Sequence, residues 1–294
     1  MSRPHPDGAE APRRGPMQPS LRPILPACAL AALGCAKHGA LPVVDDTDDV
    51  FKRAHIATKA HVEPAPYMEL RGEVQVPMAG LRFPVVVQSS APLDTLTTAE
   101  VPGLGTIIDG YVGGRAFEFN PLVGARLKDA EEAMQAALDA DPLPWSEPDR
   151  RYTSRRLAGR APYAGVECHV VEATLWAGGS ERLYFGVEDG LPRGSERQVL
   201  TAMGPVQTRF EYYDYAELCR GYPAPSRVVS HTGPLSQEMH IQTCQTEALP
   251  RVLPIPAAVQ QLIDIQVKIE AEAASAPPTD GNGHVIDDEE GCKH

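Results

Sequence analysis

Alternating apolar and polar positions dominate most of the chain. The pattern starts at Tyr67, where apolar Met68, Leu70 and Val74 alternate with charged or polar neighbours as far as Val76. A period of two is typical of a strand with one buried and one solvated face. The first regular segment is therefore predicted to be a β-strand over 67–76.

Similar short segments recur and are separated by turns that contain Gly or Pro. Four more strands are predicted in the first half of the chain, over 81–89, 92–99, 106–112 and 115–119. Seven are predicted in the second half, over 152–157, 166–175, 181–187, 198–202, 206–215, 226–231 and 237–243. Many short strands at this spacing favour an antiparallel sheet or barrel.

Three segments have helical rather than strand-like spacing. The first begins at Thr47, which can cap it, and ends near His61. The second covers 126–140 and is closed by two prolines, and the third covers 257–265. Together with the strands, they predict an α+β fold that is mainly antiparallel β.

Charge and composition limit the classes of partner. The net charge of −12 argues against nucleic-acid binding through a basic surface. Residues 267–294 contain seven acidic residues, two lysines and few large apolar side chains, so this tail is expected to be disordered.

The N-terminal segment has the order of a secretory signal. Arg22 precedes an apolar run over 24–34, which is too short to span a bilayer, and small residues precede Cys35. This arrangement resembles the lipobox of bacterial lipoproteins, although Ala32 stands where Leu is more usual. The resemblance implies a signal peptide over 1–34, with translation starting at Met17 as an option.

The same resemblance implies that Cys35 carries the lipid and anchors the chain in a membrane. Residues 35–46 would then form a tether. The expected location is the outer membrane, facing the periplasm or the cell surface. A plain secretory signal with a chance cysteine is the alternative.

Six cysteines occur in the chain. Cys219 and Cys244 lie near the ends of neighbouring predicted strands, so a disulfide between them is favoured in an exported protein, with two unpaired thiols as the alternative. No CxxC pair is present, and the one CxxH spacing, Cys35 to His38, has no second pair to complete a four-ligand set, which argues against a structural zinc site.

The order of the predicted elements is distinctive: a tether, a helix, four or five strands, a helical insertion, and six or seven further strands. Four segments also have characteristic sequences in which a strand, a Gly-containing turn and a further strand follow one another: 101–127, 157–173, 181–191 and 204–228. The chain over 47–266 resembles the outer-membrane lipoprotein-sorting superfamily, which includes LolA-type carriers and mycobacterial lipid-binding lipoproteins. The resemblance implies a strongly curved, unclosed β-barrel of about 10–12 strands, with short helices covering its concave face.

That superfamily fold implies an apolar groove that takes an acyl chain or the lipid of a lipoprotein. Apolar strand positions supply the candidate lining: Leu70, Val74, Val86, Ile107, Val170, Phe210, Tyr212, Met239 and Ile241. The same residues could simply form the core. The expected protein is a monomer that needs no cofactor or metal ion.

Other functions remain open. A lipoprotein of the same fold could sense envelope stress or bind a protein partner. A hydrolase would need convergent catalytic groups, but Cys168 and His169 are adjacent on a predicted strand and should point to opposite faces. No catalytic residue is therefore assigned. The aromatic run from Tyr212 to Tyr215 could stack on a ligand or pack across strands.

Overall fold

The computed structural model describes residues 41, 43–60, 65–141, 144–145, 147–201, 204–219 and 222–275. The signal peptide, Cys35, His61 and residues 276–294 lie outside these ranges, so the predictions made for them stay predictions. None of the described helices combines the length and apolarity needed to cross a membrane.

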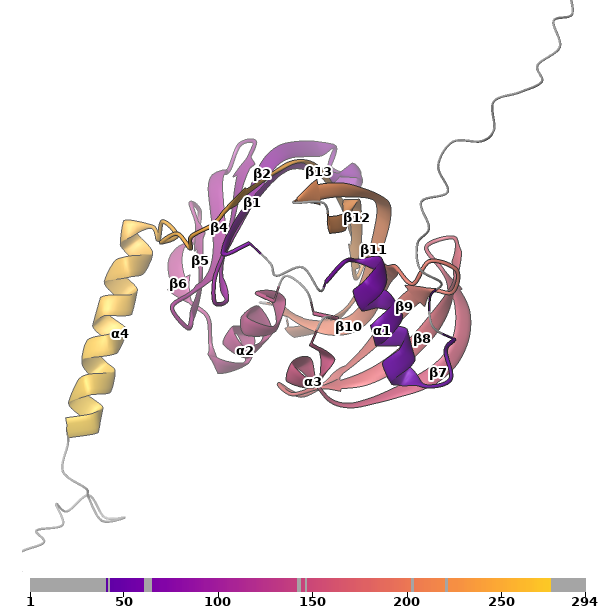
Figure 1. The fold of residues 1–294 in the computed structure, drawn as a ribbon. Helices are drawn as coiled ribbons and strands as arrows, with labels where there is room; N and C mark the ends of the chain where they lie inside the picture. Colours follow the sequence, from indigo (N-terminus) through magenta and orange to yellow (C-terminus); the bar gives the residue numbers. More distant parts are fainter. Residues whose placement is uncertain are drawn as a thin grey trace, which may run out of the picture. The chain divides into compact units, whose positions relative to one another are not determined.

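In the described ranges, thirteen strands form one curved antiparallel sheet that does not close (Figure 1). The first six are β1 (Tyr67–Val76), β2 (Leu81–Ser90), β3 (Asp94–Val101), β4 (Gly105–Val112), β5 (Arg115–Asn120) and β6 (Gly124–Leu127). The others are β7 (Tyr152–Tyr163), β8 (Val166–Leu175), β9 (Ser180–Gly186), β10 (Pro192–Thr201), β11 (Gly204–Cys219), β12 (Tyr222–Thr232) and β13 (Leu235–Glu247).

The spatial order is β6-β5-β4-β3-β2-β1-β13-β12-β11-β10-β9-β8-β7. Each half of the chain is thus a meander, and the first strand of one meander pairs with the last strand of the other. The predicted fold class is confirmed. The strand missing from the prediction is β6, a four-residue segment too short to show alternation.

The helices are α1 (Thr47–Ala57), η1 (Pro77–Ala79), α2 (Ala130–Asp139), α3 (Pro148–Arg151) and α4 (Ala257–Ser275). The cap of α1 is Asp46, one residue before the predicted Thr47, and its carboxylate accepts a hydrogen bond from Asp49 N at 3.0 Å. Carboxylates cap well because they satisfy an unpaired backbone N–H at the positive end of the helix.

The other two predicted helices have different bounds from those expected. A capping box between Asp129 and Glu132 starts α2 at Ala130, so 126–127 belong to β6 instead. Helix α4 continues to Ser275, and 267–275 are therefore helical rather than disordered. A bidentate pair between Arg115 and Glu270 holds this part of α4 beside β5.

The pairing of β1 with β13 joins the two meanders. It runs from Tyr67 opposite Glu247 to Gln75 opposite Glu238, with a bulge at Arg71/Gly72. A Cβ on Gly72 would lie 2.2 Å from the backbone oxygen of His240, a contact that no side-chain movement relieves. The close approach of the two backbones thus requires glycine at this position.

Three hydrophobic clusters pack on the sheet, and the two largest lie on opposite faces. On the concave face, Val50, Phe51 and Ala54 of α1 pack against β8 and β9. On the convex face of the first meander, Leu253 and Val259 pack in a second cluster, with residues of β3, β4 and β5. Figure 1 shows α1 and α2 on the concave side and α4 beside β5 and β6. The space on the concave side is therefore bounded by the sheet and by α1 and α2.

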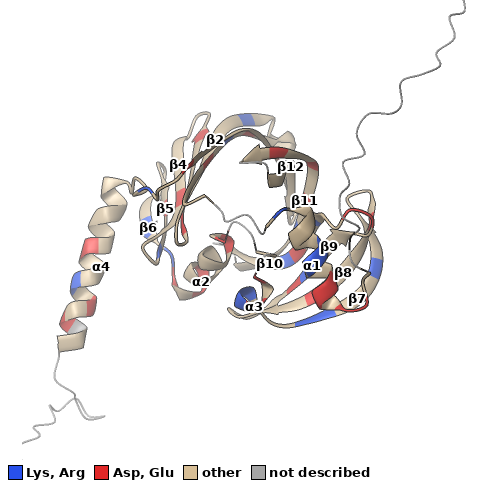
Figure 2. Cartoon of the chain, viewed as in Figure 1, with Lys and Arg blue, Asp and Glu red and all other residues tan. Residues whose placement is uncertain are grey.

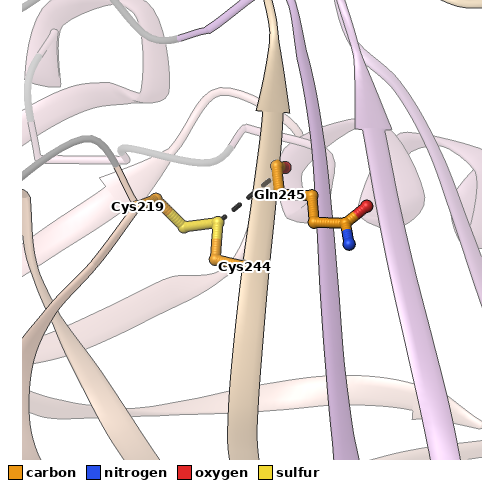
Figure 3. The surroundings of a disulfide bond; sticks show 3 residues. All are labelled: Cys219, Cys244 and Gln245. Carbon is orange, nitrogen blue, oxygen red and sulfur yellow. Dashed lines mark hydrogen bonds between the residues drawn. A yellow bond between two sulfur atoms is a disulfide. The ribbon is translucent and has the colours of Figure 1, made fainter.

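A disulfide joins Cys219 at the end of β11 to Cys244 in β13, the pair that the sequence singled out (Figure 3). The two Cα atoms are 5.4 Å apart. Residues of β12 pair with β13 only from Arg227 to Thr232. The disulfide lies outside this paired stretch and joins the end of β11, next to its turn into β12, to β13.

Candidate functional site

The candidate site is a cavity of about 1210 Å³ against the concave face of the sheet. Its wall combines helix residues, such as Leu138 of α2, with strand residues, such as Leu70 of β1 and Ile241 of β13. Small-molecule sites usually measure about 300–1,000 Å³, so this volume suits a larger ligand. Large apolar side chains form much of the lining: Met68, Leu70, Leu93, Leu138, Trp145, Trp176, Leu183, Phe185, Phe210, Leu218 and Ile241.

A smaller and more polar chamber of about 570 Å³ adjoins the main cavity. It lies between the first meander and α2, and the two spaces share Met68, Leu70, Ser89, Tyr111, Asp139 and Ala140. Charged pairs fill its wall: Lys128 with Asp109 at 2.6 Å, and Arg126 with both Glu118 and Glu132. Hydrogen bonds from Arg126 lower the pKa of Glu132 to about 2.

Four of the nine predicted groove residues line the main cavity: Leu70, Phe210, Tyr212 and Ile241. Three others share the inward face but lie outside the lining. Val74 and Met239 pair with each other and alternate in phase with Leu70 and Ile241, and Ile107 alternates in phase with Tyr111. The predicted face is right for these three, but the cavity does not extend to them.

Val86 and Val170 lie on the wrong face of the sheet for the cavity. The register places Val86 in line with Thr98 and then with Ile108, which packs on the convex-face core. Val170 packs with Tyr163 and Tyr184, whereas its neighbour Val171 packs under α1. Val86 lies inside the run Val85–Val87, and Val170 is next to Val171, so alternation cannot tell which of these residues point inward.

Charged residues in the cavity wall were missed by the sequence reasoning. Arg151, Glu181 and Arg197 are each less than one-tenth exposed and line the main cavity. Arg151 and Arg197 each come directly before a predicted strand and Glu181 begins one, so alternation gives no sign of their burial, and nothing in the sequence shows that they pair. Figure 2 shows the basic residues of α3 and the acidic residues of α2.

Arg151 and Glu181 form the first part of this buried cluster. Arg151 donates to the backbone oxygen of Leu138 at 2.6 Å and to the hydroxyl of Tyr152 at 3.1 Å, and its Nε lies 3.4 Å from Glu181 Oε2. The Tyr152 hydroxyl donates to the same carboxylate oxygen at 3.0 Å. Burial raises the pKa of Tyr152 well above its usual value, so this hydroxyl keeps its proton.

Arg197 and Asp139 form the second part of the cluster. Glu181 of β9 lies directly opposite Arg197 of β10 in the strand register, and Arg197 Nη2 donates to the carboxylate of Asp139 in α2. This bond connects α2 to the second meander. The two arginines and two carboxylates balance each other in charge. Arg151, Glu181 and Arg197 are buried, whereas the Asp139 side chain is 41% exposed.

The aromatic run from Tyr212 to Tyr215 is divided between the two faces of the sheet. Tyr212 lines the cavity, and burial raises its pKa to about 12. Tyr213 donates to Glu211 at 2.7 Å and lies under the guanidinium of Arg227. One tyrosine can therefore contact a ligand, while its neighbour packs across strands.

The proposed separation of Cys168 from His169 also holds in the structure. Cys168 packs with Tyr163 and Tyr184, and His169 points to the other side of β8. Burial raises the pKa of the Cys168 thiol to about 11, so the thiol stays protonated at neutral pH. In the described ranges, no group of three or more His, Cys, Asp or Glu residues is placed to hold a metal ion.

Removing the charge of Glu181 should destabilise the fold strongly. Glu181→Gln leaves Arg151 without a counter-charge in a buried site, and we expect the free energy of unfolding to fall by about 3–5 kcal/mol. Urea denaturation of the variant measures this change. The matched control is Glu147→Gln, which breaks an exposed pair with Arg150 and should cost about 0–1 kcal/mol.

The double variant Arg151→Met/Glu181→Gln should recover much of the loss, because it removes the unpaired charge. Equal effects of Glu181→Gln and Glu147→Gln would show that the cluster is not a buried ionic network.

No family model matches this chain, and no curated protein does. Similar solved structures include a DUF1329 family protein from Desulfovibrio piger, with 10% identity over 69% of this chain and 94% of that chain and a TM-score of 0.48. A LolA superfamily protein from Nitrosomonas europaea has 13% identity over 72% of this chain and 96% of that chain, with a TM-score of 0.47.

An outer membrane lipoprotein-sorting protein domain from Vibrio parahaemolyticus has 10% identity over 72% of this chain and 97% of that chain, also with a TM-score of 0.47. Because these identities and TM-scores are low, a function has to be argued from the cavity and the charged residues of this chain.

Proposed function

We propose that this chain is a cell-envelope protein that binds the acyl chain of a lipid or lipoprotein in the main cavity. The single observation that carries the proposal is the cavity itself: about 1210 Å³ between sheet and helices, walled largely by apolar side chains. Such a wall would contact hydrocarbon through its large apolar side chains, while its buried charges are paired with one another. It suits a long hydrocarbon ligand.

Burial of apolar surface would supply the binding energy. Each methylene removed from water contributes about 0.8 kcal/mol, so even a partly enclosed acyl chain gains enough to offset the loss of its freedom. The adjoining polar chamber would then receive the head of the ligand. The charged side chains of this chamber are already paired with one another. The chamber could therefore hold either the polar head of the ligand or water.

The proposal includes a membrane anchor at Cys35. Residues 36–46 would then serve as a tether with a reach of about 35 Å at most, so the cavity would work close to the surface that holds the anchor. An acceptor or holder of lipid, acting as a monomer at the periplasmic face of the outer membrane, fits this constraint better than a free carrier.

Mass spectrometry of protein purified from bacterial membranes tests the anchor. We expect the mature chain to begin at Cys35 and to carry the added mass of two or more acyl chains on that residue. Cleavage at another position, or an unmodified Cys35, would favour a free carrier while leaving the cavity proposal intact.

Binding of a pyrene-labelled acyl chain on a neutral head group tests the cavity. We expect saturable binding with one probe per chain. Ile241→Phe adds bulk inside the cavity and should weaken binding about tenfold or more, because a filled cavity excludes part of the chain.

The matched control is Val86→Phe, which enlarges an apolar strand residue on the opposite face and should leave the dissociation constant unchanged. Absence of saturable binding, or the same affinity in Ile241→Phe and the unaltered chain, would overturn the proposal.

A further inference from the structure

The hairpin turns at one edge of the sheet differ in chemistry from those at the other edge. The strand register places the turns after β1, β3, β5, β8 and β12 at the same edge. We call this edge the apolar rim and define it by residues 76–81, 101–105, 120–124, 175–180 and 232–235. We propose that the apolar rim docks on an electrically neutral lipid bilayer, with its turns inserted to the depth of the head groups. Docking would require neither an occupied cavity nor a lipid anchor, so it goes beyond the proposed function.

The first observation is the absence of charged side chains from the apolar rim. Asp, Glu, Lys and Arg make up 22% of the chain, but none of them occurs in the five ranges. Three of the four described turns at the opposite edge contain at least one: Asp94, Arg115, and the pair of Glu188 and Asp189. Four of the five rim turns also contain a proline, which has no backbone N–H to remove from water. Burial of the apolar rim therefore costs less desolvation energy than burial of the opposite edge.

The second observation is the exposure of large apolar side chains in these turns. Five of them are between 46% and 75% exposed: Met78, Leu122, Val123, Trp176 and Leu235. Apolar side chains gain free energy when they leave water, and tryptophan is enriched where proteins meet the surface of a membrane. The rim thus combines a low cost of desolvation with a gain from burial.

The spacing of these side chains favours a fluid surface over a protein partner. Neighbouring strands lie about 4.8 Å apart, so successive hairpin turns follow one another about every 10 Å along the edge. The rim therefore presents a row of separate apolar tips rather than one continuous patch. A protein partner would have to match every gap between the tips, whereas lipid molecules fill such gaps freely.

Polar groups just inside the strands limit how deeply the rim can enter. Arg82 Nε lies 3.2 Å from the carboxylate of Glu73, and the hydroxyl of Thr106 donates to Glu100 at 2.8 Å. Charged side chains are costly in hydrocarbon, and so are the backbone groups of a turn that lack partners. Insertion should therefore stop at the head groups.

The charge of the whole chain decides which bilayer suits the rim. The net charge of −12 repels anionic lipids, and the rim contains no lysine or arginine that would attract them. Docking should therefore be strongest on zwitterionic lipid and should weaken as anionic lipid is added.

Trp176 connects the apolar rim to the main cavity. It lies in the turn between β8 and β9, and it also lines the cavity. The cavity therefore reaches the edge that would face the bilayer. Under the proposed acyl-chain function, a lipid would pass between bilayer and cavity beside this side chain.

Flotation with phosphatidylcholine vesicles tests the docking. Every described helix and strand belongs to the compact unit that begins at Leu41, so a chain that starts at Ala36 keeps the whole fold and lacks the predicted anchor. We expect this chain to float with the vesicles, and to float less as phosphatidylglycerol replaces phosphatidylcholine. Met78→Glu/Leu122→Glu/Leu235→Glu adds three charges to the rim and should lower the partition coefficient about tenfold or more.

The matched control makes the same change at three exposed apolar residues outside the rim: Ile56→Glu/Leu249→Glu/Val252→Glu. Ile56 lies on α1, whereas Leu249 and Val252 follow β13 at the opposite edge. This variant should float like the unaltered chain. Ile241→Phe, which adds bulk inside the cavity, should float unchanged as well, because docking does not use the cavity.

Failure of the unaltered chain to float, an equal loss in the matched control, or tighter binding to phosphatidylglycerol would overturn the inference while acyl-chain binding stands. A loss of flotation in Ile265→Glu/Ile269→Glu, with the rim variant unaffected, would place the contact on α4 and would overturn it too. If the triple rim variant does not fold, Leu122→Glu alone should lower the partition coefficient about twofold or more. Absence of pyrene-probe binding would instead overturn the proposed function and leave the docking in place.

Discussion

The pairing of β1 with β13 is the constraint on which the rest of the structure depends. It makes one curved sheet out of two meanders that would otherwise be separate, and it brings Leu70 and Ile241 to the same wall. The pairing spans strands from the two ends of the folded region, so it forms only when nearly the whole chain is in place. Gly72 permits the close backbone approach at the bulge, and the Cys219–Cys244 disulfide secures β13 to the neighbouring hairpin.

The curvature of this sheet creates a concave side that two helices only partly fill. Helix α1 is fixed to the second meander by apolar packing. Helix α2 joins the same apolar cluster through Leu138 and is also held by the pair of Asp139 and Arg197. The ionic cluster therefore has two structural roles. It holds a helix against the sheet, and it places polar donors on the wall of a mostly apolar cavity.

The sequence predicted the architecture better than the site. Alternation located twelve of the thirteen strands, because a period of two needs only one solvated face, and it missed β6, which has four residues. The same alternation failed where strands are apolar on both faces, so Val86 and Val170 were assigned inward. It also could not find Arg151, Glu181 and Arg197, because polar residues are placed outside by default. Their burial depends on partners from distant strands and from α2, which no local pattern reveals.

The most direct measurement of the central claim is photocrosslinking with a diacylglycerol that carries a diazirine at the end of one acyl chain, followed by peptide mapping. Our account predicts labelling of concave-face residues in the segments around Phe210 and Ile241, with saturation at one lipid per chain. Labelling confined to the convex face, around Val86 and Val170, or labelling that does not saturate, would contradict it.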